Sequence, residues 1–139
     1  MIEVRASTRQ ELGWLCEESG LNPLNLSPNA RGVSAVQEGQ LVGVVAYDQW
    51  CANSVQAHMA VKHPAVWRRL LGPAFRFPFL EAGVGIIHGV VPGDNLKSAL
   101  HCHRMGFKLR HVVKDGIEVG VDALLFEMRR EYCRWLEAV

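Results

Sequence analysis

Apolar and polar positions alternate along this chain in short stretches, and their spacing predicts a mixed α/β domain. Alternation at every second residue is typical of strands, whereas apolar residues three or four positions apart are typical of helices. In order, these patterns predict a strand at 2–5, a helix capped at 7–8 and ending near 19, a loop at 21–31, strands at 32–37, 41–47 and 55–61, a helix starting at 63–64, a strand at 84–91, a helix at 95–105, strands at 107–113 and 117–128, and a helical tail at 129–137.

Local signals mark where several of these elements begin, turn or stop. Glu11 follows Thr8 at the capping-box distance, so a helix is expected to start there. Glu38-Gly39-Gln40 joins two Val-rich stretches and predicts a hairpin. Gly72-Pro73 is expected to interrupt the helix that starts near residue 63. Asp115-Gly116 predicts the turn between the last two strands.

The apolar runs also predict what is buried. Residues 84–91 form a continuous apolar run, which is typical of a strand buried on both faces, so His88 is expected to be a core histidine. In the tail, Tyr132, Leu136 and Trp135 are expected to face inward. The longest apolar runs are far shorter than the roughly 20 residues of a membrane helix, so no membrane partner is expected.

Composition narrows the class of protein. The chain has 139 residues, 49% of them hydrophobic and 21% charged, which is typical of one globular domain spanning residues 1–139. The four cysteines are far apart and form no Cys-x-x-Cys pair, which favours reduced thiols over disulfides or a zinc ribbon. With no secretory signal at the start, the protein is expected to be cytoplasmic.

One motif in the helix at 95–105 points to a family. Asn95, Ser98, Cys102, Gly106 and Phe107 resemble the motif of the GNAT superfamily of acyl-CoA N-acyltransferases, in which an Asn is followed by a small residue, a Tyr and Gly-Phe at these spacings. Four of the five positions match, and the order of the predicted elements is similar along nearly the whole chain.

The resemblance implies a fold and an activity. The expected fold is α/β (α+β), a GNAT-like acyl-CoA N-acyltransferase fold with a mixed, mostly antiparallel central sheet and helices on both faces. The expected reaction transfers an acetyl group from acetyl-CoA, the co-substrate, to an amine by direct attack. In such a protein the fourth strand, at Met59 and Val61, would bind the cofactor, and Asn95 and Ser98 would lie where the pantetheine arm passes.

The phosphate-binding loop departs from the family pattern. Family members usually carry a glycine-rich loop whose amides hold the pyrophosphate. The corresponding residues 61–69 contain no glycine, and Pro64 removes an amide donor. Either Lys62, Arg68 and Arg69 hold the phosphates with their side chains, or the cofactor site has been lost and these residues are a solvated basic face.

Position 102 is the second departure, because the family's Tyr acid is replaced by Cys102. A thiol near its usual pKa of about 8.5 could give a proton to the leaving coenzyme A sulfur. The alternative is a small buried residue, with water protonating the leaving group.

A catalytic base is also needed, since most amines are protonated at neutral pH. His58 shares a face of the fourth strand with Gln56 and is the first candidate; the alternative is a partly exposed histidine without a catalytic role. Asp48 and Glu81 are weaker candidates that are expected to be solvated at the surface.

Charge is unevenly distributed along the chain. Its formal net charge is +1, but residues 1–61 carry −3, residues 62–114 carry +7 and residues 115–139 carry −3. The basic middle segment coincides with the elements that, by the resemblance, would face the phosphates of coenzyme A.

Several alternatives stay open at this point. A catalytically inactive GNAT-like structural or binding protein, of the kind found among small phage-borne members, explains the missing glycines and Tyr. Nucleic-acid binding ranks last, because no nucleic-acid motif is present. No metal is expected, since the side chains of His101, Cys102 and His103 diverge around a helix. The acceptor is a small-molecule or protein amine, and a homodimer is one option for the assembly.

Overall fold

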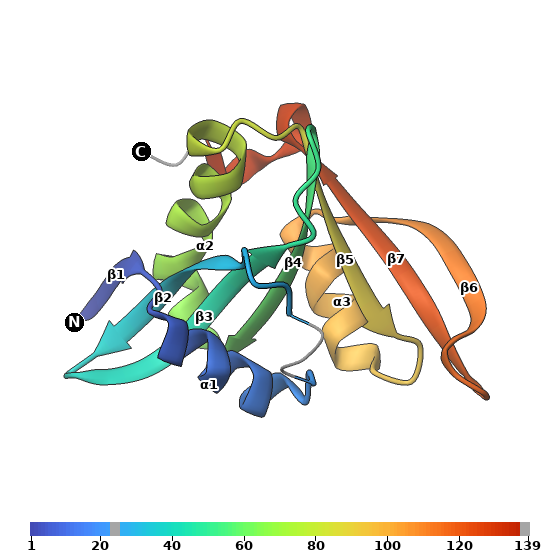
Figure 1. Ribbon diagram of the computed structural model, residues 1–139, viewed down its shortest axis with the longest axis horizontal. Coiled ribbons are helices and arrows are strands. Elements are labelled where there is room, and N and C mark those ends of the chain that lie inside the picture. The colour runs from blue at the N-terminus through green and yellow to red at the C-terminus, as the bar shows by residue number, and fades with distance from the viewer. Residues whose placement is uncertain (23–25, 137–139) are drawn as a thin grey trace.

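The computed structural model describes residues 1–22 and 26–136 of the chain. Within them, one sheet holds the strands in the order β1-β2-β3-β4-β5-β7-β6. All neighbours are antiparallel except β4 and β5, which are parallel. The strands are β1 (Ile2–Ala6), β2 (Arg31–Gln37), β3 (Gln40–Asp48), β4 (Ser54–Val61), β5 (Ile86–Pro92), β6 (Lys108–Glu118) and β7 (Val121–Arg129). The mixed, mostly antiparallel sheet is as predicted, and β1 and β6 form its two edges (Figure 1).

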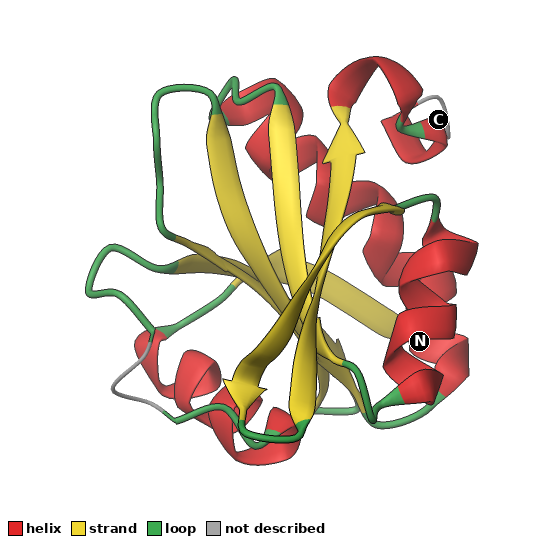
Figure 2. Ribbon diagram, turned by 90° about the vertical axis from the view of Figure 1, so that its right-hand side faces the viewer, coloured by secondary structure: helices red, strands yellow, loops and turns green. Residues whose placement is uncertain are grey.

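Helices cover both sides of this sheet (Figure 2). They are α1 (Arg9–Ser19), the 3-10 turn η2 (Pro64–Val66), α2 (Trp67–Arg76), the π-helical turn η3 (Phe77–Glu81), α3 (Leu96–Met105) and the 3-10 turns η4 (Arg130–Tyr132) and η5 (Arg134–Leu136). The larger core cluster joins the sheet to α2 and to the end of α3, and a smaller one joins it to α1. In the part of the chain described, no helix is long and apolar enough to cross a membrane.

Local hydrogen bonds explain the start of α1. The Thr8 hydroxyl accepts a hydrogen bond from the Glu11 amide (3.2 Å), and the Glu11 carboxylate accepts one from the Thr8 amide (2.8 Å). This is the predicted capping box. The helix ends at Gly20, whose φ of 73° is left-handed, as the sequence indicates. The β2–β3 hairpin is also confirmed, with Glu38 and Gly39 at positive φ in its turn.

The predicted break at Gly72-Pro73 is wrong, because α2 runs through Pro73 to Arg76. Proline costs the helix one backbone hydrogen bond, but buried apolar side chains lie on both sides of it, Leu70 before and Phe75 after. Continuing the helix keeps both residues in the core. The hydrogen bond from the buried Tyr47 hydroxyl to the Ala74 carbonyl (2.7 Å) also depends on it.

The turn predicted at Asp115-Gly116 is wrong as well. The chain turns at Val119 and Gly120, and Asp115 lies inside β6 as an irregular position with φ of 56°. Asp115 accepts a hydrogen bond from the Gly120 amide (2.9 Å), and its own amide donates to Asp122 (3.1 Å). The Asp-Gly pair therefore forms a bulge that supports the neighbouring turn.

Strand β5 is buried on one face only, contrary to the prediction for 84–91. Ile87 and Val91 are buried, whereas His88 and Val90 are exposed, so His88 is not a core histidine. The reason is that α1 packs against β2, β3 and β4 and leaves its side of β5 uncovered.

The tail forms two 3-10 turns in place of one helix. Tyr132 is 64% exposed, so its predicted inward position is wrong, and Cys133 takes the buried place. Trp135 and Leu136 do pack against the core, and the Trp135 indole donates a hydrogen bond to the Met105 carbonyl (2.9 Å). Trp135 thus connects the second 3-10 turn to the end of α3.

Candidate active site

The parallel strands β4 and β5 are paired over only part of their length. Pairing covers Ser54 to Gln56 of β4 opposite Ile86 to His88 of β5. Beyond these residues the two strands diverge toward their carboxyl ends, with α3 behind the widening space (Figure 1). Among the described residues, the β5-facing backbone of 57–61 therefore has no strand partner. Such unpaired peptide groups can hold an extended ligand by backbone hydrogen bonds.

A buried carboxylate and a histidine lie beside the point of divergence. His58 Nε2 is 2.7 Å from Asp48 Oδ1. The Asp48 side chain is 1% exposed and the His58 side chain is 16% exposed. The other carboxylate oxygen of Asp48 accepts a hydrogen bond from the Ser27 amide (3.1 Å), so the loop after α1 helps to hold it.

This contact fixes which nitrogen of His58 can react. An ionised carboxylate only accepts hydrogen bonds, so Nε2 of His58 carries the proton that it donates to Asp48. In the neutral ring Nδ1 then has a free lone pair and can accept a proton. The expectation that Asp48 is a solvated surface residue is wrong, because it is buried against its histidine partner.

Strand register explains why these two residues meet. In the β3–β4 ladder Ala46 lies opposite His58 and Asp48 lies opposite Gln56, so His58 and Asp48 are diagonal neighbours on one face. The sequence already placed His58 on a face with Gln56. Carrying the register of the predicted β2–β3 hairpin on to the β3–β4 pair would have identified Asp48 as the partner of His58.

The same face of the sheet continues, uncovered, onto β5 and β7. Gln56 is paired with His88, and His88 with Glu127. Burial raises the pKa of Glu127, but hydrogen bonds and charge from Arg110 (3.0 Å) and Arg129 (3.3 Å) outweigh it and leave the pKa lowered. A molecule that approaches Nδ1 of His58 from this side would therefore meet a polar, partly charged wall.

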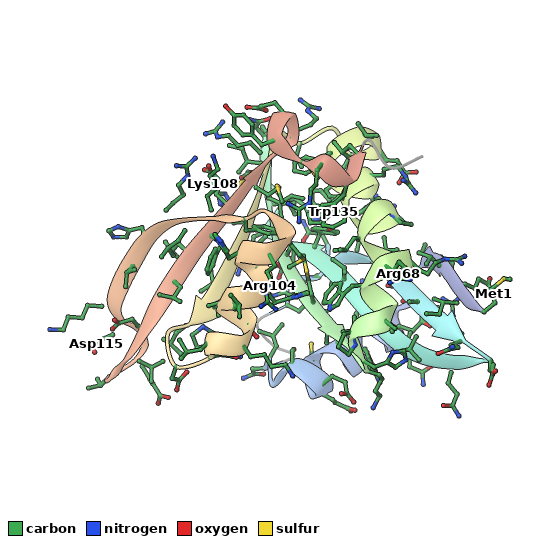
Figure 3. All side chains as sticks on the ribbon, turned by 180° about the vertical axis from the view of Figure 1, so that it is seen from behind. Met1, Arg68, Arg104, Lys108, Asp115 and Trp135 are labelled. Carbon is green, nitrogen blue, oxygen red and sulfur yellow. The ribbon has the colours of Figure 1, made fainter. Side chains whose placement is uncertain are left out.

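The start of α2 offers few backbone amides. The Val66 amide donates to the His63 carbonyl (3.1 Å), the Trp67 amide donates to the Pro64 carbonyl, and Pro64 has no amide hydrogen. An anion there would have to be held mainly by side chains. Arg68 and Arg69 are exposed in the first turn of α2, and neither forms an ion pair within 1–22 or 26–136; Figure 3 marks Arg68 on α2.

The other cofactor candidates on β4 differ in orientation. Lys62 lies on the side of α1, where its ammonium is 3.0 Å from the Glu18 carboxylate and 5.8 Å from the centre of the Trp14 ring. Met59 and Val61 are half-buried and pack on the opposite face, against the larger core cluster. Lys62 is thus paired with Glu18 on the face of the sheet opposite to Met59 and Val61.

The motif at the start of α3 forms the expected helix. The side-chain Oδ1 of Asn95 accepts a hydrogen bond from the Ser98 amide (3.2 Å) and caps α3. Gly106 ends the helix with a left-handed φ of 109°, and Phe107 is buried. Burial raises the pKa of Cys102 to about 11. Cys102 is therefore a weaker acid than an ordinary thiol.

An aromatic contact links α2 to α3. The rings of Trp67 and His101 are 4.5 Å apart between centroids. Nε2 of His101 is buried without a hydrogen-bond partner in the described part of the chain, and burial followed by the charge of Arg104 lowers the pKa of His101. The two rings therefore pack as neutral groups between these helices.

Comparison with known proteins supports the fold and no closer relationship. No protein-family model matches the sequence, and a search of curated proteins finds no relative. Among solved structures, a mutant form of the spermidine/spermine N-acetyltransferase SpeG from Vibrio cholerae matches with a TM-score of 0.75 at 14% identity, over 99% of each chain. A Desulfovibrio desulfuricans protein assigned to the GNAT family of acetyltransferases matches with a TM-score of 0.72 at 14% identity, over 93% of this chain and 99% of the other.

A third structure gives the same result at a lower score. The N-acetyltransferase PseH from Campylobacter jejuni matches with a TM-score of 0.66 at 14% identity, over 93% of this chain and 98% of PseH. The chain therefore has the fold of GNAT acetyltransferases, as its sequence predicts. At this identity the likeness concerns the fold, so activity has to be argued from the residues of the site.

Proposed function

We propose that this protein is an N-acyltransferase that transfers an acetyl group from acetyl-CoA to an amine. The observation that carries the proposal is the His58–Asp48 pair beside the diverging ends of β4 and β5, in a fold shared with N-acetyltransferases. An amine acceptor requires a base, because only the deprotonated amine is nucleophilic. His58, held by the buried Asp48 carboxylate, is suited to this role.

Acetyl-CoA would lie along the diverging strands. The backbone of β4 at Met59 and Val61 would bind the acyl group and the pantetheine arm, and the first turn of α3, at Asn95 and Ser98, would flank that arm. Arg68 and Arg69 would hold the phosphates in place of a glycine-rich loop, in line with the excess of basic residues at 62–114. Lys62 could join them only by leaving Glu18.

The chemistry follows from the hydrogen bonds of His58. Its Nδ1 takes a proton from the acceptor's ammonium group while Asp48 stabilises the resulting imidazolium. The amine lone pair then attacks the thioester carbonyl, a C–N bond forms, and the C–S bond breaks to release the coenzyme A thiolate; the second proton of the attacking nitrogen passes to water as the neutral amide forms. The raised pKa of Cys102 makes it a poor acid for this thiolate, so we assign that proton to water and a packing role to Cys102.

The proposal also covers the amine acceptor, the cellular compartment and the oligomeric state. SpeG is by name a spermidine/spermine N-acetyltransferase. For this chain we propose an amine acceptor, small molecule or protein, on the uncovered face beside His58 and His88. Since all four cysteines are free thiols, we place the enzyme in the cytoplasm. A homodimer remains a proposal, which light scattering would test.

A second candidate is a GNAT-like binding protein without activity. It is favoured by the 3-10 turn at Pro64–Val66, in which backbone amides that a phosphate would need already donate hydrogen bonds to carbonyl groups of the turn. The Trp67–His101 contact between α2 and α3 also favours it. In this case the basic residues of α2 would bind no coenzyme A.

Thermal unfolding with acetyl-CoA separates the two candidates. A ligand that binds only the folded state raises its melting temperature by mass action. We expect millimolar acetyl-CoA to raise the Tm of the wild type and of Lys114→Gln, an exposed residue on β6, but not of the double variant Arg68→Gln/Arg69→Gln. No shift in the wild type would remove the proposed function.

Turnover then tests the base. With an amine that the protein acetylates, His58→Gln should lower kcat roughly 100-fold or more and leave the acetyl-CoA-induced Tm shift intact. His111→Gln, which removes an exposed histidine on β6, is the matched control. A Tm shift without turnover of any amine would favour the binding protein, and full activity of His58→Gln would rule out His58 as the base.

A further inference from the structure

A second site lies away from the diverging strands, at the β1 edge of the sheet. A groove of about 750 Å³ runs between the β1–α1 junction and the start of β2 on one side, and the end of α2 with η3 on the other. Its volume is in the range of small-molecule sites, roughly 300–1,000 Å³. No residue of the proposed transfer site lines it; the weak base candidate Glu81, which is exposed, does.

Most of the residues that line this groove belong to segment 1–61, and the lining is basic although that segment is acidic overall. Residues 1–61 carry a net charge of −3, yet the three basic residues they contain, Arg5, Arg9 and Arg31, all line the groove. Arg76 comes from α2, and Glu81 is the acidic residue among the lining side chains. Because Arg5 is paired with Glu11, it is Arg9 and Arg31 that make the groove attractive to anions.

These guanidinium groups are held in different ways. Arg5 pairs with Glu11 through two contacts of 2.8 Å. Arg9 donates one hydrogen bond to the Pro28 carbonyl (2.9 Å). The Arg31 side chain makes no hydrogen bond or ion pair with the described residues, and its guanidinium lies 5.8 Å from the centre of the Phe77 ring. Its donors therefore remain available while the ring helps to orient it.

The rest of the groove is apolar. Phe77 and Leu80 come from η3, and Val4 and Leu12 line the opposite side. Leu80 is 56% exposed although it is a large apolar side chain. An apolar wall next to a basic rim suits a ligand with a hydrocarbon body and one anionic end.

We propose that this groove binds an organic carboxylate with an apolar body. The carboxylate would accept paired hydrogen bonds from the Arg31 guanidinium and a further one from Arg9, and the hydrocarbon would pack against Phe77 and Leu80. This site is separate from the proposed acetyl transfer and does not depend on it.

Three small-molecule probes with hydrocarbon tails of similar length and different head groups test the proposal. Octanoate, octanol and octylammonium are titrated into the ¹⁵N-labelled chain of 139 residues, and binding is followed by amide chemical shifts around Gly32. We expect octanoate to bind saturably and at least about tenfold more tightly than octanol, with no binding of octylammonium. Equal affinity for octanol, or no saturable binding of octanoate, would overturn the proposal.

Variants show whether the groove is responsible. Arg31→Gln and, separately, Arg9→Gln should weaken octanoate binding about tenfold, while Lys114→Gln removes a charge elsewhere and should not. Both arginines are exposed, so the variants are expected to fold, which urea unfolding checks. Octanoate affinity should be unchanged by saturating acetyl-CoA. Competition between the two, or an unchanged affinity in both arginine variants, would place the binding elsewhere and overturn the proposal.

Discussion

Asp48 is the residue whose role depends most on its partners. Its burial would be unfavourable without compensation, and it is compensated by hydrogen bonds from His58 and from the Ser27 amide. In the proposed reaction the carboxylate would act through His58: it would set which ring nitrogen is protonated and stabilise the charged ring. It is a positioning residue for the proposed base.

Replacing Asp48 by Asn tests that role. The Asn side chain can still accept a hydrogen bond from Ser27, but its amide group would donate to His58 Nε2 and shift the ring proton to Nδ1. We expect kcat to fall roughly 10²–10⁴-fold with a smaller change in KM, in steady-state kinetics at saturating acetyl-CoA. A variant that is folded and loses only substrate affinity would contradict the positioning role.

Glu11 gives a prediction about stability and pH. The hydrogen bond from Arg5 is the main cause that lowers the pKa of Glu11 from 4.5 to about 2; burial opposes it, and hydrogen bonds from Thr8 and Ser34 add to it. A carboxyl whose pKa is lower in the folded state stabilises the fold above its unfolded pKa, and this contribution is lost as the pH falls.

We therefore expect Glu11→Gln to lower the free energy of unfolding at pH 7 by about 1 kcal/mol, a modest value because the partner Arg5 is exposed to solvent. The difference from the wild type should shrink as the pH falls from about 4.5 toward 2, measured by urea unfolding. Glu17→Gln, elsewhere on α1, is the control. A difference that stays constant with pH would show that charge is not the cause.

At the scale of elements, long-range packing overrode two local signals. Pro73 should end a helix and Asp115-Gly116 should form a turn, yet α2 continues through the first and β6 through the second. In both cases the local preference amounts to a few kcal/mol at most and competes with burial or pairing of a whole segment. Signals that no tertiary contact opposed, such as the capping box and the Gly20 helix end, predicted the structure correctly.

Gly13 in α1 and Gly32 in β2 give a matched pair of predictions. Gly13 lies within α1 with nothing within 4 Å of an added Cβ, so Gly13→Ala should stabilise the protein by about 0.5–1 kcal/mol. At Gly32 an added Cβ would lie 2.9 Å from the Val45 carbonyl oxygen and 2.9 Å from the Ser7 hydroxyl. Gly32→Ala should destabilise by roughly 1–3 kcal/mol.

Chemical denaturation of both variants measures these differences. The opposite signs are the informative result, since the chemical change is the same and only the space around it differs. If Gly32→Ala proved as stable as the wild type, β2 would have to move away from β3 at little cost, and the close approach would not constrain the sheet.

At the scale of the whole molecule, charge distribution carries the prediction. The net charge is only +1, but residues 62–114 hold +7 and include the exposed Arg68 and Arg69. If these side chains hold the phosphates, binding of acetyl-CoA should weaken as salt screens them, with a Debye length that falls from about 10 Å at 0.1 M to about 3 Å at 1 M.

We expect the Tm shift produced by a fixed concentration of acetyl-CoA to shrink steadily with added NaCl. The acetyl-CoA shift of Arg69→Gln should be smaller than that of the wild type at low salt and nearly equal to it at 1 M. Lys114→Gln should follow the wild type throughout. Salt-independent binding would mean that backbone groups, rather than these side chains, hold the cofactor.

The sequence by itself determined the elements that depend on near neighbours. The helix caps at Thr8 and Asn95, the Glu38-Gly39 turn and the order of strands and helices follow from hydrogen bonds and periodicities within a few residues, and they led to the fold. They also placed His58 on the face where it lies. The glycine-free loop at 61–69 and the Cys at position 102 are likewise facts of the sequence.

Only the tertiary structure decided which distant residues meet. Asp48 pairs with His58 because the β3–β4 register makes them diagonal neighbours, and the loop after α1 buries the carboxylate. Arg31 joins the arginines of the β1–α1 junction at one groove because β2 lies beside β1. Such contacts depend on strand register and on how helices cover the sheet, and these are set by burial over the whole molecule.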